Sequence, residues 1–208
     1  QLMVGSEGTL GIVTKIVLKL LPQNKHNVLL LVPFYKADQA CEAVSAIFRA
    51  GIVPSALEFM ERDAIDWTIK FVDGLNVEVK DNVQAHLLIE VDGNYPKILM
   101  QEAEQILAVV EQFEIDEVLF ADTEEQKNAL WKMRRSVAEA VKANSIYKEE
   151  DTVVPRYELP KLLKGIKEIG TKYGFQSVCY GHAGDGNLHV NIIKGNMSDD
   201  NWKTEVPK

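Results

Sequence analysis

Two histidines flank an Asp-Gly pair near the end of the chain, in residues 180–191, which read YGHAGDGNLHVN. An Asp-Gly pair between alternating strands predicts a two-residue hairpin turn, because both turn positions take positive φ. Placing Asp185 and Gly186 at that turn pairs His182 with His189 across the hairpin. Directly opposed residues have Cβ atoms roughly 5 Å apart, so the two imidazoles can share one metal ion or one substrate group.

The same pairing sorts the hairpin side chains onto two faces, because successive side chains of a strand point to opposite sides. Tyr180 then faces Asn191 across the hairpin, and Cys179 faces Ile192. We therefore expect one polar, ligand-bearing face and one apolar face that belongs to the core. The polar face carries Tyr180, His182, His189 and Asn191, and the apolar face carries Cys179, Ala183, Leu188, Val190 and Ile192.

His182 and His189 offer two neutral nitrogen ligands, which suit Zn, Mn or Fe. Two ligands are too few for a catalytic metal site, which needs a third ligand, typically a carboxylate. The alternative interpretation is a pair of solvent-facing histidines on an ordinary hairpin. His26 and His86 have no comparable neighbours in the sequence and are interpreted as incidental.

Arg134 projects from an apolar stripe of a predicted helix. A guanidinium that faces inward loses its hydration and requires a planar anion, most naturally a carboxylate. That carboxylate belongs either to a protein Asp or Glu or to a substrate, and the helix alone does not decide between them. Lys148, just beyond the helix, is either a second cation on the same pocket or a surface lysine. The stripe consists of Leu130, Trp131, Val137, Ala138 and Val141.

Three glycines precede a predicted strand near the N-terminus, in the stretch GSEGTLGI at residues 5–12. Glycine-rich backbone can approach a cofactor closely and present its N–H groups to phosphate or ring atoms. The stretch matches neither GxGxxG nor the P-loop pattern, and it precedes a strand where those motifs precede a helix. The spacing alone therefore favours a tight turn.

The composition excludes several classes of partner. The chain has 208 residues and a formal net charge of −8, whereas nucleic acids and anionic membrane surfaces are bound by basic patches. No apolar stretch approaches the length of a membrane span. Cys41 and Cys179 are too few for a disulfide framework and fit a reducing compartment, so we expect the cytoplasm. Because the chain opens with Gln1 and shows no closing element before Lys208, we expect a piece of a longer protein.

The elements that position these residues begin with a strand at 11–21, where apolar and polar residues alternate up to Pro22. Two β-α-β patterns follow, and they predict an α+β fold: a ferredoxin-like antiparallel sheet with helices packed on one face. Their strands are expected at 27–34, 53–60, 85–91 and 117–121, and their helices at 36–50 and 96–113, with an extra helix at 64–71.

The remaining part of the chain departs from this repeat. A long helix is predicted from Thr123, an N-cap whose capping box includes Gln126, to Lys142. An extended segment at 151–155, a helix at 158–173 and a C-terminal β-hairpin at 177–193 complete the expected order.

Four of these segments resemble FAD-linked oxidases of the vanillyl-alcohol oxidase type. The resemblance is to the group formed by the glycolate oxidase FAD subunit, D-lactate dehydrogenase and D-2-hydroxyglutarate dehydrogenase. The segments occur in the family's order and spacing, cover nearly the whole chain, and include one highly specific motif, the last. They are GSEGTLGIVT at 5–14, LWKMRR at 130–135, IYK at 146–148 and YGHAGDGNLHVN at 180–191.

The resemblance implies that residues 1–22 close an upstream FAD-binding domain and that residues 23–208 form a C-terminal substrate or cap domain, truncated at its C-terminus. The implied reaction oxidises a small 2-hydroxy acid to the 2-oxo acid by hydride transfer to FAD. Ala138 replaces a hydroxyl residue of hydroxyglutarate-type relatives, which favours a glycolate- or D-lactate-type substrate. The implied site consists of Arg134, Lys148 and Asn191 for the substrate, His182 and His189 for a divalent metal such as zinc, and Glu7, Gly8, Gly11 and Ile12 for FAD.

In the family, the third metal ligand and the catalytic base lie in a Glu-His-Gly segment after the hairpin, and the chain ends before such a segment. We therefore expect this chain alone to hold no FAD and to be inactive, and we expect other oxidase subunits or a second copy as partners. Two other classes compete: a non-catalytic ferredoxin-like module that binds a ligand or partner, and a metal hydrolase built on His182, His189 and Asp185. The hydrolase ranks last, because Asp185 serves the geometry of the turn.

Overall fold

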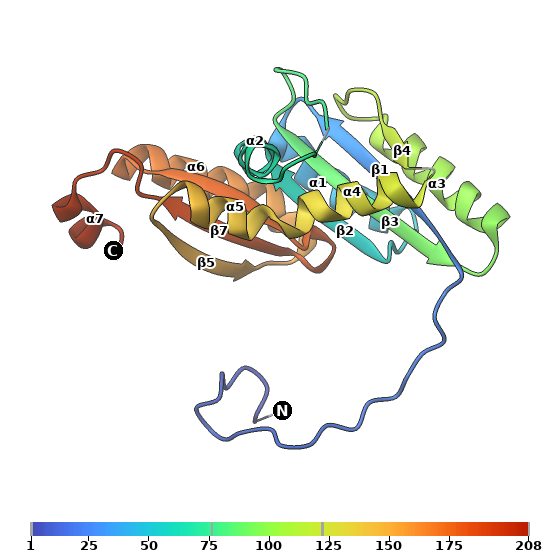
Figure 1. Ribbon diagram of the computed structural model, residues 1–208, viewed down its shortest axis with the longest axis horizontal. Helices are drawn as coiled ribbons and strands as arrows, with labels where there is room; N and C mark the ends of the chain where they lie inside the picture. Colours follow the sequence, from blue (N-terminus) through green and yellow to red (C-terminus); the bar gives the residue numbers. More distant parts are fainter. Residues whose placement is uncertain (1, 76, 122, 208) are drawn as a thin grey trace.

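The computed structural model describes residues 2–75, 77–121 and 123–207 (Figure 1). Its strands form one seven-stranded antiparallel sheet in the order β4-β1-β3-β2-β6-β7-β5. The strands are β1 (His26–Phe34), β2 (Ala56–Glu61), β3 (Ala85–Gly93), β4 (Leu119–Ala121), β5 (Tyr147–Val153), β6 (Gln176–Gly181) and β7 (Asn187–Ile193). The helices are α1 (Ala37–Arg49), α2 (Arg62–Phe71), α3 (Pro96–Val110), α4 (Glu124–Arg135), α5 (Val137–Asn144), α6 (Leu159–Tyr173) and α7 (Asp199–Glu205), with 3₁₀ turns η1 (Arg156–Glu158) and η2 (Ala183–Asp185).

The first four strands confirm the predicted ferredoxin-like unit. Two β-α-β units, β1-α1-β2 and β3-α3-β4, place their strands in the order β4-β1-β3-β2. The register sets apolar residues opposite one another, with Val28 facing Val91 and Leu30 facing Ile89. These side chains belong to one buried cluster, to which α1 and α3 also contribute. The α+β class is therefore confirmed.

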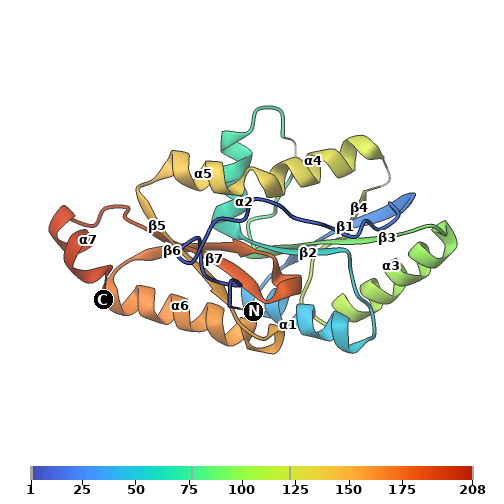
Figure 2. The same cartoon turned by 90° about the horizontal axis from the view of Figure 1, so that it is seen from below.

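Helices cover both faces of the sheet, whereas one covered face was expected from the sequence. One buried cluster contains residues of α1, α3 and α6, the other residues of α2, α4 and α5, and Figure 2 shows the two groups on opposite sides. The reason lies in β1, where Leu30 and Val32 join the first cluster while Leu29 and Leu31 join the second. A strand that is apolar on both faces requires cover on both.

The C-terminal strands confirm the predicted hairpin but pair in a different register. Tyr180 lies opposite His189 and Cys179 opposite Val190, so the expected pairing of His182 with His189 is wrong by two residues. Because the shift is even, each side chain keeps its predicted face. The expected apolar face is confirmed for Cys179, Ala183, Leu188 and Val190, which lie in the cluster that includes α1 and α6.

The register differs because the connection between β6 and β7 is longer than two residues. Ala183 to Asp185 form the 3₁₀ turn η2, and Gly186 then takes a positive φ of 78°. A Cβ atom at Gly186 would stand 2.0 Å from the carbonyl oxygen of Val154, so glycine is required there. The Asp-Gly pair marks the turn, but the packing of the neighbouring segment determines its length.

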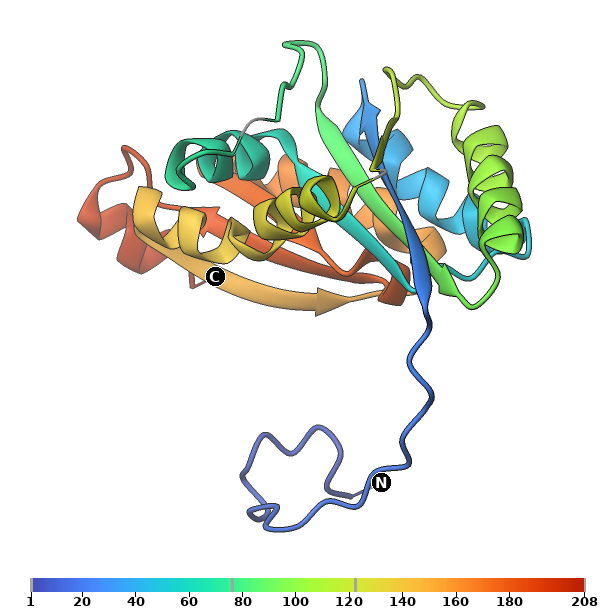
Figure 3. The ribbon, with the colours of Figure 1, turned by 45° about the vertical axis from the view of Figure 1, so that its right-hand side comes forward.

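The strand predicted at 11–21 is not formed. Residues 11–24 contain no regular element, and Figures 1 and 3 show the N-terminal segment running away from the sheet. Its apolar side chains are exposed; Ile12 and Val17, for example, each retain 88% exposure. Alternating residues form a strand only where another strand takes up their backbone N–H and C=O groups, and no described strand lies beside this segment.

The predicted long helix over residues 123–142 is divided into two helices, α4 and α5. Ser136 separates them, with its N–H bonded to the carbonyl oxygens of Lys132 and Met133. The predicted capping box is confirmed, since the Thr123 hydroxyl oxygen accepts from the backbone N–H of Gln126 and the Gln126 side-chain oxygen accepts from the backbone N–H of Thr123. The other predicted strands and helices are present within a few residues of their expected bounds, and α7 was not predicted. Within the described ranges, no helix is both long and apolar enough to cross a bilayer.

Candidate functional site

Glu58 of β2 joins the two segments that the sequence singled out for chemistry. Its Oε2 atom accepts a hydrogen bond from Nε of Arg134 at 2.8 Å, and its Oε1 atom lies 2.9 Å from Nδ1 of His182. Glu58 and Arg134 are 6% and 8% exposed. One buried carboxylate therefore contacts both the arginine of α4 and a histidine next to the β6–β7 turn.

The position of Glu58 follows from the alternation of β2. Leu57 and Phe59 point into the cluster with α1 and α3, so Glu58 shares the opposite face with Met60. A carboxylate inside an apolar strand needs a cationic or hydrogen-bonding partner, since burial otherwise disfavours its charge. Glu58 was not predicted from the sequence, although an acid within a strand and an arginine within an apolar helix stripe are complementary signals. Their pairing requires the placement of α4 over β2, which local periodicity does not provide.

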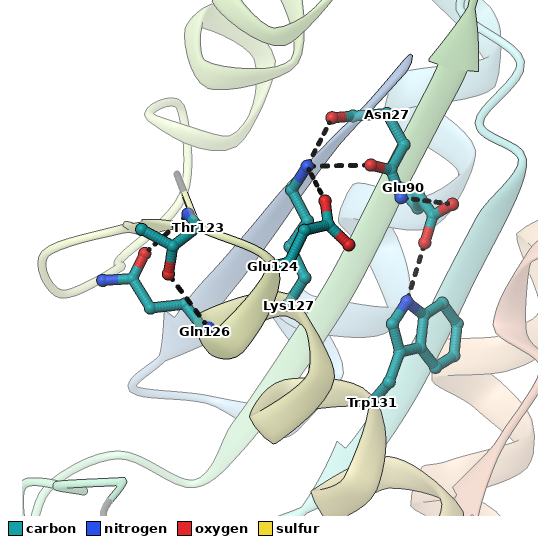
Figure 4. A network of polar contacts seen from close by, with 7 residues as sticks. All are labelled: Asn27, Glu90, Thr123, Glu124, Gln126, Lys127 and Trp131. Carbon is teal, nitrogen blue, oxygen red and sulfur yellow. Dashed lines mark hydrogen bonds and ion pairs between the residues drawn. The ribbon is translucent and has the colours of Figure 1, made fainter. Parts of the chain in front are cut away.

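A polar network holds α4 on the sheet and thereby positions Arg134 (Figure 4). Trp131 donates its indole N–H to Oε2 of Glu90 at 2.7 Å, and Nζ of Lys127 bonds the side chain of Asn27 at 2.8 Å. Glu90 in turn accepts a hydrogen bond from Asn27 at 3.3 Å, so the contacts that α4 makes with β1 and with β3 form one connected network. Arg134 follows Trp131 by three residues, which places it about one turn further along the helix.

Arg134 retains hydrogen-bonding capacity that Glu58 does not use. Its Nη2 atom lies 2.7 Å from the Oε2 atom that already accepts from Nε, yet this buried Nη2 makes no well-aligned hydrogen bond to any residue that the structure describes. A bidentate pair would use both carboxylate oxygens. Here the second oxygen, Oε1, faces His182 instead. The guanidinium carbon also lies 5.3 Å from the ring centroid of Tyr180, within cation–π range.

The two histidines lie close together even though they do not pair in the sheet. Their ring centroids are 6.0 Å apart with planes at 74°. His189 stacks on Tyr180, with 5.2 Å between centroids, and its Nδ1 atom lies 3.0 Å from Oε1 of Glu149. Nδ1 of each imidazole therefore faces a carboxylate, Glu58 for His182 and Glu149 for His189. This leaves the Nε2 atoms as the ring nitrogens that can meet a ligand.

This arrangement fits part of a metal site. A metal-binding histidine commonly turns its other ring nitrogen toward a carboxylate, which fixes the ring and raises its basicity. His182 makes such a hydrogen bond with Glu58, whereas Nδ1 of His189 lies near Glu149 without hydrogen-bond geometry to any described residue. Across the described ranges, however, no group of three His, Cys, Asp or Glu side chains is arranged to hold a metal ion. The chain's described residues offer two nitrogen ligands, and the metal itself stays a prediction.

Asn191 lies on the same face of the sheet as the histidine cluster. It is 1% exposed, and its Nδ2 group donates to the carbonyl oxygen of Val178 at 3.3 Å. Burial, followed by the charge of Glu149, raises the pKa of Tyr180, while a hydrogen bond with Asn191 acts in the opposite direction. The hydroxyl of Tyr180 is therefore kept as a neutral group beside Asn191.

Lys148 is not brought together with Arg134. In β5, Tyr147 packs in the cluster that includes Arg134's helix, so the next residue, Lys148, points to the opposite face. Its Nζ atom pairs with Glu150 at 2.7 Å, with both side chains about half exposed. The surface interpretation of Lys148 accounts for these contacts.

The four residues predicted to contact FAD belong to the N-terminal segment, which runs away from the sheet (Figure 3). Gly8 takes a φ of 79°, and Glu7, with a φ of 48°, is a non-glycine residue in the left-handed region. Gly11 and Ile12 follow in backbone without regular structure. Their predicted role is to contact FAD. No contact of the described residues tests this role, so it stays a prediction.

Comparison with known proteins places the chain beside a defined family. Residues 23–207 match the family model described as FAD linked oxidases, C-terminal domain. The D-lactate dehydrogenase of Anaerostipes hadrus is 35% identical, with 99% of this chain and 44% of that protein covered. The glycolate oxidase subunit GlcD of Bacillus subtilis is 38% identical, with 91% and 40% covered. The chain therefore spans less than half the length of these relatives.

Solved structures support the same fold at low sequence identity. An alkyldihydroxyacetonephosphate synthase matches with a TM-score of 0.59 at 15% identity, covering 96% of this chain and 41% of that one. A p-cresol methylhydroxylase matches with a TM-score of 0.55 at 11% identity, covering 88% and 42%. At such identities the likeness concerns the fold alone.

Proposed function

The chain belongs to the FAD-linked oxidases, C-terminal domain family, and we propose that it is the substrate-binding cap domain of a flavin-dependent oxidoreductase. The proposed reaction converts a small 2-hydroxy acid, of the glycolate or D-lactate type, to the 2-oxo acid. The names of the relatives support this class, since they include a D-lactate dehydrogenase and a glycolate oxidase subunit. FAD, when bound, accepts the hydride that leaves C2 of the substrate.

The unused hydrogen-bonding capacity of Arg134 carries the proposal. Its buried Nη2 atom has an ion-pair contact with Oε2 of Glu58 at 2.7 Å, an oxygen that it shares with Nε, but it makes no hydrogen bond to any described residue. Buried donors in proteins are nearly always satisfied, so a guanidinium nitrogen that has only a shared, poorly aligned carboxylate oxygen favours the binding of a further anion. A substrate carboxylate meets this need with the planar oxygens that a guanidinium recognises.

The neighbouring side chains orient the substrate around that carboxylate. One oxygen of Glu58 accepts a hydrogen bond from Nε of Arg134, and the other oxygen faces His182. The arginine that would bind the substrate and the histidine that would bind the metal therefore keep a fixed separation. Asn191 lines the same face of the sheet. Lys148 is left out of the proposed pocket, because it pairs with Glu150 on the other face.

A divalent metal, with zinc as the first candidate, is part of the proposal. His182 and His189 would hold it through Nε2, and the third ligand would come from outside the described residues. A metal bound there would lower the pKa of the substrate's 2-hydroxyl group. The carboxylate neighbours of both rings support this role.

The N-terminal segment is proposed to belong to an FAD-binding domain. Residues 1–22 lie outside the matched family region, and the exposed apolar side chains of residues 10–21 support their burial against another domain. Glu7, Gly8, Gly11 and Ile12 would then contact FAD. A cytoplasmic location is proposed from the buried thiols of Cys41 and Cys179, which form no disulfide.

The substrate class can be tested by flavin reduction in the FAD-loaded protein that contains this chain. D-Lactate, glycolate and D-2-hydroxyglutarate are compared with D-lactamide, which keeps the 2-hydroxyl group but lacks the carboxylate. We expect at least one of the acids to reduce the flavin, and D-lactamide to reduce it roughly a hundredfold more slowly than D-lactate. Equal reduction by D-lactate and D-lactamide would contradict the assigned role of Arg134, and no reduction by any acid would favour a non-catalytic binding module.

A further inference from the structure

A cavity of about 470 Å³ lies away from the histidine cluster. It opens between β1, the loop at residues 77–83 and the residues that lead into β4. Its wall is mainly aliphatic, formed by Leu31, Val77, Val79, Val83, Val118 and Leu119. None of these residues contributes to the proposed 2-hydroxy-acid site.

Hydrogen bonds and an ion pair hold the walls of this cavity in place. Nη1 of Arg62 donates to the carbonyl oxygens of Lys80, Asp81 and Val83 at 2.9, 3.2 and 3.1 Å. Nζ of Lys80 then bonds Oδ1 of Asp116 at 2.7 Å, which ties the loop to the segment before β4. The N–H of Asp116 donates to the carbonyl oxygen of Pro33 at 3.0 Å. The cavity is therefore bounded by segments that are fixed to one another.

His86 of β3 is one of the residues that line this largely aliphatic cavity. The side chain is only 2% exposed, and its buried Nδ1 atom has no hydrogen-bond partner among the described residues. Burial, assisted by the nearby charge of Arg62, lowers the pKa of His86 to about 4, so the ring is neutral near pH 7. The histidine interpreted as incidental from the sequence is thus a neutral imidazole with an unused hydrogen-bonding nitrogen.

We propose that this cavity binds a small uncharged molecule with an apolar body and one hydroxyl group. The apolar body would lie against the aliphatic wall, and the hydroxyl would bond Nδ1 of His86. A hydroxyl group can donate or accept, so it satisfies either tautomer of a neutral imidazole.

The charges at the cavity select against anions. Lys80 is the cation of the lining and is already paired with Asp116, while Glu78 and Glu117 add negative charge. This pattern differs from the proposed 2-hydroxy-acid site, where the guanidinium of Arg134 attracts a carboxylate. The two sites therefore differ in ligand class.

Benzyl alcohol serves as the probe, with toluene as the analogue that lacks the hydroxyl and phenylacetate as the anionic analogue. Binding to the chain is followed by NMR through the methyl signals of Val77, Val79 and Val118. We expect benzyl alcohol to bind roughly five- to tenfold more tightly than toluene, the effect of one hydrogen bond, and phenylacetate not to bind. The proposal is overturned if the methyl signals do not shift with benzyl alcohol, or if phenylacetate binds equally well.

Two variants separate this site from general surface binding. His86→Leu is expected to abolish the preference for benzyl alcohol over toluene, whereas His26→Leu, at an exposed position, leaves it unchanged. Val79→Trp changes a half-buried loop residue of the wall and is expected to weaken both probes. An unchanged preference in His86→Leu would contradict the assigned contact. Arg134→Ala is expected to leave benzyl alcohol binding intact, so this result is independent of the proposed oxidoreductase function.

Discussion

At the residue scale, Glu58 combines two interactions that are usually separate. It neutralises the buried Arg134 and also contacts His182, a predicted metal ligand. A buried ion pair contributes little net stability compared with apolar residues, but loss of one partner leaves an uncompensated charge. Glu58 therefore makes the buried position of Arg134 tolerable while leaving the buried Nη2 group without a hydrogen bond.

Glu58→Ala is expected to reduce the free energy of unfolding by about 3–5 kcal/mol, because it leaves the Arg134 guanidinium buried without a counter-charge. The matched control is Glu150→Ala, which removes an equally close pair with Lys148 at 2.7 Å but at the surface. That change should cost at most about 1 kcal/mol. Urea denaturation measures both. Similar losses in the two variants would show that the Glu58 pair is not buried in solution.

His86 gives a pH-dependent prediction for stability. Its pKa is about 4 in the folded chain, compared with 6.5 for an ordinary histidine such as that of the unfolded chain. The unfolded chain therefore takes up a proton first as the pH falls. The folded state therefore loses stability between about pH 6.5 and pH 4, by up to about 3 kcal/mol, and the contribution is fully present above pH 6.5. Denaturation of the native chain and of His86→Leu should show the native chain losing up to about 3 kcal/mol of stability relative to the variant as the pH falls across this range. Parallel curves would contradict the buried, neutral state of His86.

At the element scale, periodicity predicted most strands and helices but not the contacts between them. The alternation of the hairpin assigned Tyr180, His189 and Asn191 to one face correctly, since an even register shift preserves the faces. The register itself depends on the length of the η2 turn, which is fixed by Val154 on a different segment. Glu58 was missed for the same reason: its partners come from α4 and from the residue after β6.

The η2 turn can be tested through its glycine. Gly186→Ala is expected to reduce stability by more than the roughly 1–2 kcal/mol of a left-handed alanine, because the new Cβ would also meet the carbonyl oxygen of Val154. Gly174→Ala is the control, since Gly174 has a similar φ of 75° and no atom within 4 Å of a Cβ. Chemical denaturation compares the two. Equal losses would indicate that the β5 end does not pack against the turn.

At the scale of the whole molecule, the sheet and its two helix layers form a unit that does not include the N-terminal segment. The alternation of residues 11–21 is that of a strand, yet none of the described strands pairs with the segment and its apolar residues are exposed. Sequence periodicity reports the tendency of a segment to pair, whereas pairing requires a second strand. In the same way, local periodicity does not show which helices pack on which face of the sheet, so the cover on both faces was recognised only in the folded chain.

Deletion of residues 1–22 is expected to leave the melting temperature within a few degrees of the original value, since the segment lies away from the sheet. The shortened chain should also aggregate less, because the deletion removes exposed apolar residues such as Ile12 and Val17. Thermal unfolding and light scattering measure both effects. A large fall in the melting temperature would mean that the segment packs on the sheet in solution.

The central claim, that Arg134 binds the carboxylate of a 2-hydroxy acid, is tested most directly by flavin reduction with D-lactate in the FAD-loaded protein that contains this chain. Arg134→Ala is compared with Arg135→Ala, which removes the neighbouring exposed arginine of the same helix. We predict a roughly ten- to hundredfold slower reduction at low substrate concentration for Arg134→Ala and an unchanged rate for Arg135→Ala. Equal rates in the two variants would contradict the claim.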